Sequence, residues 1–236
     1  DGAFAQFVKV KASEVFPVAT SWTDAELGSI PCAYATAENM VQRTKIDDRD
    51  KVLIPGASGG VGSALVQLAK RRGAYIIAIT SSEKMAAVKS LGVDEVYERS
   101  TPILKGIGEK SISVLLDNVG GEFFKDGLKL LQRGGRYGSS GAIAGPMVNF
   151  DMRDFYLKDL ALIGCTAWDS SVFPSLVSYI EQGEIRPLVS RSYPLSSIVE
   201  AQRDFLEKRH VGKLVLHPPA VEPEQISFLR EIYPPN

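Results

Sequence analysis

The sequence predicts an α/β fold built around a doubly wound parallel sheet. Short apolar runs alternate with amphipathic segments through the middle of the chain. One of these runs, Ala74–Thr80, is apolar at nearly every position, as is typical of a strand buried on both faces of a parallel sheet. A glycine-rich turn joins the first run to the first amphipathic segment. Strands separated by crossover helices in this way indicate a parallel sheet and argue against a sandwich or a helix bundle.

The first predicted unit is a strand over Lys51–Pro55 followed by a helix over Gly60–Arg72. Apolar residues recur in that helix at the spacing of a single buried face. A second helix, Ser82–Leu91, ends before Gly92, the usual residue beyond a helix C-terminus. The remaining elements continue the alternation, with strands at Ala74–Thr80, Val93–Tyr97, Ser113–Asp117, Arg136–Gly141 and Leu160–Thr166, and helices at Gly121–Gln132 and 171–182.

The two ends of the chain do not fit this alternation. Phe4–Val10 alternates like a strand, and Thr23 and Glu26 have the spacing of a capping box at a helix start. A tail unit follows, with the run Ile185–Tyr193, a helix over Ser197–Lys208, a strand over Lys213–Leu216 and an irregular stretch from Pro218 onward. We therefore expect a sheet domain at 46–166, with the helix 171–182 packed on it, between flanking units at 1–45 and 185–236.

Composition excludes several classes of protein. The 236 residues carry 27 basic and 28 acidic side chains, for a formal net charge of −1, without long blocks of either sign. Nucleic acid and anionic membranes require a basic face, so neither is an expected partner. Two cysteines cannot form a secreted disulfide framework, and no apolar run approaches the length of a membrane span. We expect a cytoplasmic protein.

The chemistry is concentrated in the loop Gly56–Gly62, which has glycines at 56, 59 and 62. A strand must turn into a helix here within a few residues, with its backbone amides directed at a pyrophosphate. A Cβ atom at the closest positions would block that approach, so this spacing between a strand and a helix predicts a dinucleotide site. The expected binding residues of the loop are Ser58, Gly59, Gly60, Val61 and Gly62.

The same loop also fits the nucleophile elbow of α/β-hydrolases, with Ser58 as the nucleophile. That alternative requires a histidine later in the chain, and His210 and His217 are the candidates. His210 lies in a charged run that is typical of a solvated helix end, and both histidines are expected at the surface. The third glycine, Gly62, has no purpose in such an elbow, so a hydrolase is the weakest alternative.

The end of the second strand selects the cofactor, because NAD enzymes place a carboxylate there to bind the ribose hydroxyl. This chain has Ser81 and Ser82 there, followed by Glu83 and Lys84. Hydroxyls and a lysine suit a 2′-phosphate, which a carboxylate would repel. NADPH is therefore the expected cofactor; the alternative is NADH, with Glu83 reaching the ribose and Lys84 as a surface residue.

Several segments together resemble the medium-chain dehydrogenase/reductase superfamily, which includes zinc alcohol dehydrogenases, quinone oxidoreductases and enone reductases. They are the glycine loop, Thr80–Lys84, Asp117–Gly121, Gly134–Gly138 and His210–Leu216. The resemblance implies a Rossmann domain with partial GroES-like catalytic-domain segments at both ends. It aligns Asp1–Ala5 with the end of the catalytic domain, so that roughly the first hundred residues of a full-length member are expected to be missing.

The resemblance also implies roles for residues at the carboxyl ends of strands. Arg99 is expected to cover the adenine or its phosphate. The cofactor side is expected to be lined by Asn118, Val119, Ser140, Gly141, Ala142, Cys165 and Thr166. Cys32 matches the third zinc ligand of the zinc branch, whereas its alternative role is that of a structural thiol. Zinc is therefore expected only in a full-length parent, and the catalytic residues remain unknown.

The function implied is hydride transfer between a nicotinamide cofactor and an alcohol or carbonyl substrate. The expected oligomeric state is a homodimer. Two alternatives stay open, a zinc-free quinone or enone reductase and a fragment that binds the dinucleotide without catalysis.

Overall fold

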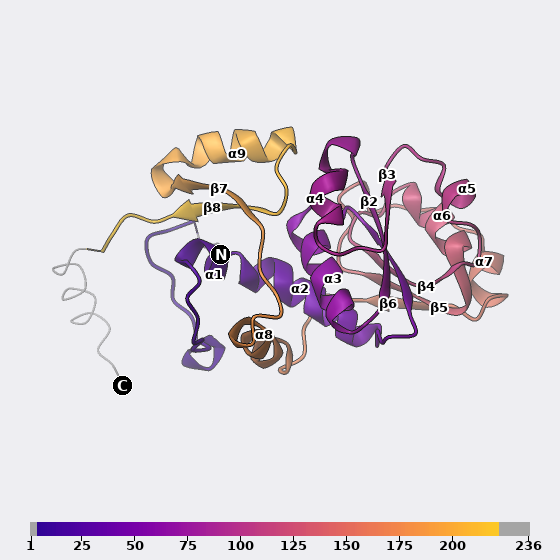
Figure 1. The fold of residues 1–236 in the computed structure, drawn as a ribbon, viewed down its shortest axis with the longest axis horizontal. Helices are drawn as coiled ribbons and strands as arrows, with labels where there is room; N and C mark the ends of the chain where they lie inside the picture. The colour runs from indigo at the N-terminus through magenta and orange to yellow at the C-terminus, as the bar shows by residue number, and fades with distance from the viewer. Residues whose placement is uncertain (1–3, 222–236) are drawn as a thin grey trace.

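The computed structural model describes residues 4–221 of the chain. Six parallel strands form one sheet in the order β3-β2-β1-β4-β5-β6, as Figure 1 shows on its right-hand side. The strands are β1 (Lys51–Pro55), β2 (Tyr75–Thr80), β3 (Glu95–Glu98), β4 (Ile112–Asp117), β5 (Leu131–Ser139) and β6 (Ala161–Gly164). The order reverses between β1 and β4, which is the point where open parallel sheets bind ligands. The predicted α/β fold is confirmed.

Helices cover both faces of the sheet. One apolar core gathers side chains from α2 (Ile30–Arg43), α3 (Gly60–Arg71), α4 (Met85–Lys89) and α8 (Val172–Glu181). The other gathers them from α5 (Ile103–Gly106), α6 (Phe123–Leu130) and α7 (Met152–Tyr156). The central strands are therefore buried on both sides, which explains why Ile76–Ile79 is a continuous apolar run.

A second unit, the return unit, contains β7 (Val189–Pro194), η3 (Leu195–Ser197), α9 (Ile198–Glu207) and β8 (Lys213–His217). β7 and β8 pair in parallel as a separate two-stranded sheet, which lies beside α9 in Figure 1. Two hydrogen bonds attach the chain just before this unit to the helices of the sheet domain. The hydroxyl of Tyr34 on α2 donates to the carbonyl of Arg186 at 3.1 Å, and the side chain of Gln67 on α3 donates to the same carbonyl at 2.9 Å.

The buried carboxylate of Glu38 links α2 to the end of α3 and to α8. Glu38 on α2 is fully buried, and its Oε1 accepts from Arg72 at 2.6 Å, Gln42 at 2.9 Å and Tyr179 of α8 at 3.2 Å. The helix predicted at 171–182 is thus observed as α8 and packs on α2.

The N-terminal segment departs from expectation. Phe4–Val10 forms no strand in the structure, and Phe4 and Val8 expose 67% and 65% of their surface. Its alternation was misleading because no strand among residues 4–221 offers backbone partners to this segment. The capping box is confirmed: Thr23 accepts from the amide of Glu26 and Glu26 accepts from the amide of Thr23, at the start of α1 (Asp24–Gly28).

Boundaries differ most around β5. The helix predicted to Gln132 ends at Leu130, and the strand predicted to begin at Arg136 begins at Leu131. The register of β5 against β4 shifts there, and Gly134 has a positive φ of 74°, so an irregular strand replaces the last helical turn. The helix predicted at Ser82–Leu91 is a 3-10 turn, η2 (Ser82–Lys84), followed by the short α4.

Residues 1–3 and 222–236, including part of the segment Asp1–Ala5 and most of the stretch from Pro218 onward, lie outside the described residues. Within the described chain, no helix has the length and apolarity needed to cross a membrane.

Candidate dinucleotide site

The glycine loop makes the turn that the sequence predicted. Gly56 follows β1 with a positive φ of 66°, and Gly59 is the residue at the N-cap of α3. A Cβ atom on Gly62 would lie 2.8 Å from the Cα of Ala57 and would overlap the carbonyl oxygen of Gly56. Gly62 is therefore required by the packing of the helix on the turn, whereas Gly59 has ordinary dihedral angles and its nearest neighbour would be 3.5 Å from an added Cβ. A Cβ atom on Gly59 would therefore make only an ordinary van der Waals contact.

The return unit closes one side of this loop. The amide of Gly212 donates to the carbonyl of Ser58 at 2.8 Å, and Gly59 and Gly212 form an isolated parallel bridge. The side chain of Lys213 then crosses Gly60, since a Cβ added there would lie 2.5 Å from the Lys213 Cδ. A lysine over the N-terminus of α3 supplies positive charge beside amides that already favour an anion.

The carboxyl ends of β2 and β3 bring two basic side chains together. The amide of Arg99 donates to the carbonyl of Thr80 at 2.8 Å, which places Arg99 beside the segment that carries Ser81 and Lys84. Burial lowers the pKa of Lys84, and the charge of Arg99 lowers it further. The ammonium of Lys84 donates to the carbonyl of Lys208 in the return unit.

The hydroxyl of Thr80, at the end of β2, is also part of this region. Thr80 is only 4% exposed, and its Oγ1 has no hydrogen-bond partner among the described residues. Buried hydroxyls normally have a partner. A polar ligand group at this position would supply one.

Asp117 organises the opposite side of the site. It is fully buried at the end of β4, and its Oδ1 accepts from the amides of Val119 at 2.7 Å and Gly120 at 3.1 Å. The hydroxyl of Tyr137 donates to Oδ2 at 2.8 Å. Burial and the charge of Asp117 raise the pKa of Tyr137, so the phenol stays a donor. The turn that carries Asn118 is thereby held in a fixed conformation.

The loop after β5 lies against this turn. The amide of Ala144 donates to the carbonyl of Val119 at 2.8 Å, and a Cβ on Gly141 would lie 3.3 Å from the carbonyl oxygen of Asn118. The predicted residues Ser140, Gly141 and Ala142 therefore border Asn118 and Val119, with Ser140 half-buried and the other two exposed.

Cys165 and Thr166 follow β6, one strand further along the sheet. The amide of Cys165 donates to the carbonyl of Ser139 at 2.8 Å, and burial raises the pKa of its thiol. Its side chain belongs to the apolar core, so only its main chain can face a ligand. Thr166 is exposed.

Cys32 is exposed and is the third residue of α2. Among the described residues, no group of three or more histidine, cysteine, aspartate or glutamate side chains is arranged to hold a metal ion. The donors present do not by themselves fit zinc, and we derive no step from it.

The structure places His210 differently from expectation. It is partly buried and its ring stacks on that of Phe205, with 5.4 Å between the centroids, rather than lying in solvent at a helix end. His217 is exposed, as expected. Within the described part of the chain, Ser58 accepts from the amide of Gly212 through its backbone carbonyl, and the buried Nδ1 of His210 has no hydrogen-bond partner. The structure therefore gives no support to a hydrolase in which Ser58 is paired with His210.

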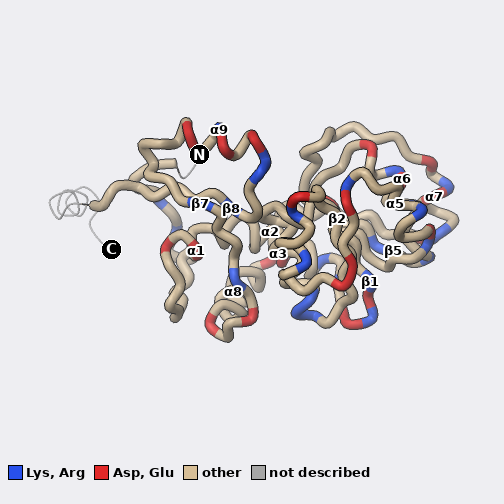
Figure 2. Tube along the Cα trace, turned by 45° about the horizontal axis from the view of Figure 1, so that its top comes forward, with Lys and Arg blue, Asp and Glu red and all other residues tan. Residues whose placement is uncertain are grey.

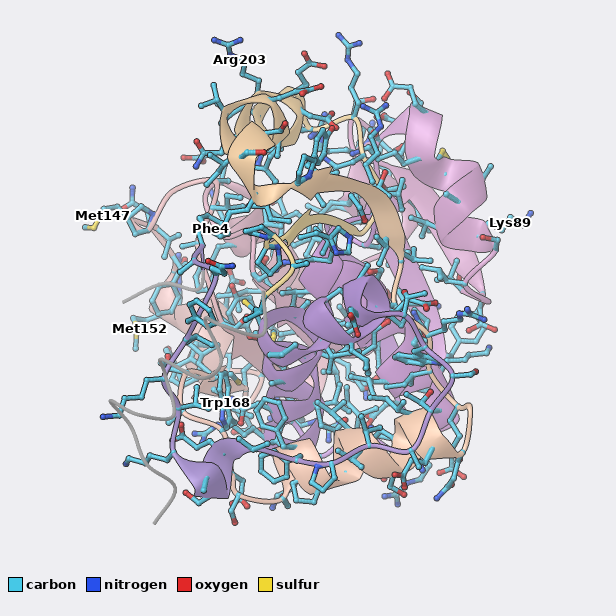
Figure 3. The ribbon with its side chains drawn as sticks, turned by 90° about the vertical axis from the view of Figure 1, so that its left-hand side faces the viewer. Phe4, Lys89, Met147, Met152, Trp168 and Arg203 are labelled. Carbon is cyan, nitrogen blue, oxygen red and sulfur yellow. The ribbon has the colours of Figure 1, made fainter. Side chains whose placement is uncertain are left out.

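Several exposed apolar side chains lie in the loop after β5 and on α7, whereas charged side chains are mixed in sign. Basic and acidic positions are interspersed in the view of Figure 2. Apolar side chains project from the loop after β5 and from α7: Ile143 exposes 76%, Met147 88% and Met152 56% of their surface. Figure 3 shows Met147 and Met152 at the same border of the molecule. Such side chains are available to a substrate or a partner surface.

The fold thus gathers most of the predicted residues at one edge of the sheet, and it adds Thr80, Lys213 and His210, which the sequence prediction missed. The motif His210–Leu216 contained two of them. Their relation to the loop depends on the bridge between Gly59 and Gly212, a contact between distant parts of the chain.

Three comparisons with known proteins agree with this geometry. Residues 60–182 match a family model described as zinc-binding dehydrogenase. A solved putative alcohol dehydrogenase from Sinorhizobium meliloti 1021 is 46% identical, with a TM-score of 0.81 over 86% of this chain and 57% of its own. An acryloyl-coenzyme A reductase from Metallosphaera sedula is 31% identical over 218 residues, which are 92% of this chain and 65% of that protein.

A solved 2-octenoyl-CoA carboxylase reductase, in complex with NADP and 2-octenoyl-CoA, is 27% identical with a TM-score of 0.81. The match covers 93% of this chain and 57% of that protein. The chain therefore spans about six-tenths of the length of these three proteins.

Proposed function

This chain belongs to the zinc-binding dehydrogenase family of the medium-chain dehydrogenase/reductase superfamily, whose members are NAD(P)-dependent oxidoreductases. From this membership we propose that its site binds NADPH and serves hydride transfer to or from an alcohol or carbonyl substrate. NADPH supplies the hydride when bound. The residues of the chain bind and orient it.

The observation that carries the preference for NADPH is the pair Lys84 and Arg99. Both lie beyond the carboxyl ends of neighbouring strands, and serines occupy positions 81 and 82, directly after β2, with the carboxylate of Glu83 coming only at the next position. A 2′-phosphate placed there would gain charge-assisted hydrogen bonds. NADP bound to the solved 2-octenoyl-CoA carboxylase reductase supports the same choice.

The remaining predicted residues have complementary roles in this proposal. Ser58, Gly59, Gly60, Val61 and Gly62 bind the pyrophosphate through backbone amides, assisted by Lys213. Asn118, Val119, Ser140, Gly141 and Ala142 border the nicotinamide side, where Cys165 and Thr166 offer main-chain groups.

A second candidate function is reduction of a carbon–carbon double bond conjugated to a carbonyl group. The similarity to an acryloyl-coenzyme A reductase and to a 2-octenoyl-CoA carboxylase reductase favours it. Hydride donation from the same cofactor position would serve both reactions, so the two candidates differ only in the substrate.

The first test is a fluorescence titration of the 236-residue chain with NADPH and with NADH. The second test is an assay of NADPH oxidation with aldehydes, quinones, enones and enoyl thioesters as substrates. Tighter binding of NADPH than of NADH is expected. Binding without turnover of any substrate would favour a non-catalytic dinucleotide-binding chain, and the absence of binding would overturn the proposal.

We also propose that the chain is a cytoplasmic homodimer. The edge strand β6 supports this assembly, because it ends the sheet and Leu162 exposes 40% of its surface. Sedimentation equilibrium tests the oligomeric state, and a monomer at micromolar concentration would contradict it.

A further inference from the structure

His210 lies between two contacts that join the return unit to the dinucleotide site. On one side of it in the sequence, the carbonyl of Lys208 accepts a hydrogen bond from Lys84. On the other side, the amide of Gly212 donates to the carbonyl of Ser58 at 2.8 Å. The segment that carries His210 is therefore held against both the start of α4 and the glycine loop.

The immediate surroundings of His210 suit a neutral imidazole. The ring stacks on Phe205 with an interplanar angle of 28°, and its Nδ1 is buried with no hydrogen-bond partner among the described residues. A protonated imidazole donates from both nitrogens. Protonation would therefore leave an unsatisfied buried donor at Nδ1 unless a new acceptor arrives.

The charges that face His210 come from three elements. Burial lowers the pKa of His210 and the charge of Lys84, at the end of η2, lowers it further. Lys208 beyond α9 and Lys213 on β8 act in the same direction, whereas Asp204 on α9 opposes them. The carboxylate of Asp204 already accepts hydrogen bonds from Tyr193 at 2.6 Å and from Arg191 at 3.0 Å. Its negative charge is therefore partly compensated by Arg191 before it acts on His210.

Three cations, Lys84, Lys208 and Lys213, therefore act on the imidazole against a single anion, Asp204. Figure 2 shows basic positions where the chain leaves α9 toward the sheet domain. Lys84, the residue that approaches this segment from the sheet domain, is the one assigned above to the 2′-phosphate.

We infer that His210 is a specificity residue for the phosphorylated dinucleotide, neutral in the free protein and protonated when the 2′-phosphate enters beside Lys84. His210 can play this role only if the chain binds NADPH, as proposed above. A phosphate monoester carries close to two negative charges, and this charge favours the imidazolium. NADPH binding would then take up one proton from solvent, and NADH binding would take up none.

The experiment measures dissociation constants of NADPH and NADH between about pH 6 and pH 8.5, the range in which histidine titrates. It compares the wild-type chain with His210→Gln, which keeps a polar side chain of similar reach without a titrating charge. The 2′-phosphate itself titrates in this range, and its effect is common to both proteins.

The expected result is a difference between the two proteins. Relative to His210→Gln, the wild type binds NADPH about 3- to 10-fold more tightly near pH 6, the scale of one charge-assisted hydrogen bond. This advantage disappears near pH 8.5. NADH binding is the same for both proteins at every pH.

Arg209→Gln is the matched control, because Arg209 is the exposed neighbour of His210 and pairs with Glu207 at 3.5 Å. It removes a nearby positive charge that does not titrate, so it should shift NADPH affinity equally at all pH values.

Calorimetry of the wild type in buffers of different ionisation enthalpy counts the protons directly. At about pH 7.5 a phosphate with a second pKa near 6 is already almost fully ionised, so proton uptake that accompanies NADPH but not NADH comes from the protein, and it decides the question even if His210→Gln fails to fold. Uptake of no proton specific to NADPH, or parallel pH profiles for wild type and His210→Gln, would overturn the inference while leaving NADPH binding intact. A wild type that binds neither dinucleotide would overturn the proposed function and the inference with it.

Discussion

Gly62 packs directly on the backbone of Gly56, so that a Cβ atom added to Gly62 would overlap the carbonyl oxygen of Gly56. Gly59 lies in the same loop, yet the nearest atom to a Cβ added there would be 3.5 Å away. The three glycines of the loop therefore serve different purposes. Gly56 makes the turn with a positive φ and Gly62 lets the helix pack on it, whereas Gly59 has no such packing role and is the position where we propose that the pyrophosphate approaches.

Substitution of two of these glycines should separate folding from binding. Gly62→Ala should lower the free energy of unfolding by about 1–3 kcal/mol, the usual cost of overpacking. Gly59→Val should leave stability nearly unchanged and abolish NADPH binding, because the added side chain occupies the space of the pyrophosphate. Urea unfolding and fluorescence titration measure the two effects. Normal NADPH affinity in folded Gly59→Val would show that the ligand does not approach this residue.

Lys84→Ala should weaken NADPH binding by about 1–3 kcal/mol, the scale of a charge-assisted hydrogen bond, and leave NADH binding nearly unchanged. Lys89→Ala is the matched control, since Lys89 is an exposed lysine at the end of α4, the helix that follows Lys84, and projects from the surface in Figure 3. It should change neither affinity. Equal losses for both cofactors in Lys84→Ala would instead assign Lys84 a structural role through its contact with Lys208.

The buried carboxylate Glu38 makes a third prediction possible. Arg72→Ala removes the cation that donates to Glu38 at 2.6 Å and leaves a buried charge without its ionic partner. The expected loss of stability is about 3–5 kcal/mol. Arg133→Ala, which breaks an exposed pair with Asp159, should cost less than about 1 kcal/mol. Similar urea midpoints for the two variants would contradict this ranking.

The sequence pattern predicted the sheet domain well because its signals are local. The apolar run Ala74–Thr80 and the turn at Gly56 depend on neighbours only a few residues away, and both appear as predicted. Phe4–Val10 shows the opposite case, because an alternating segment becomes a strand only when another strand offers backbone partners. Nothing within Phe4–Val10 itself indicates whether such a partner exists.

The candidate site residues were predicted from their local sequence positions, and their binding roles stay predictions. Lys84 and Arg99 were identified separately from their positions after two strands, and parallel pairing brought them together. The contribution of the return unit was not predicted, because the contact from Lys84 to Lys208 joins residues 124 positions apart. His210 was expected in solvent since its neighbours in the sequence are charged. Its position is instead determined by the attachment of Gly212 to the loop.

Tyr137 and Asp117 give a prediction about pH. Tyr137 has a raised pKa because of burial and the charge of Asp117, so the unfolded chain loses this proton at a lower pH than the folded chain. The stabilising contribution is therefore complete below the ordinary tyrosine pKa of about 10 and declines as the pH rises above it. Tyr137→Phe lacks the phenol and cannot show that decline.

At about pH 8, where free tyrosine is protonated, Tyr137→Phe should be less stable than the wild type by about 1–3 kcal/mol, because one oxygen of a buried carboxylate loses its phenolic donor. The difference should shrink at about pH 10.5, above the ordinary tyrosine pKa. Tyr156→Phe is the control, because Tyr156 exposes 56% of its surface. Urea unfolding at the two pH values measures all three proteins. A difference between wild type and Tyr137→Phe that stays constant with pH would show that the phenol stabilises the turn by packing alone, without its bond to Asp117.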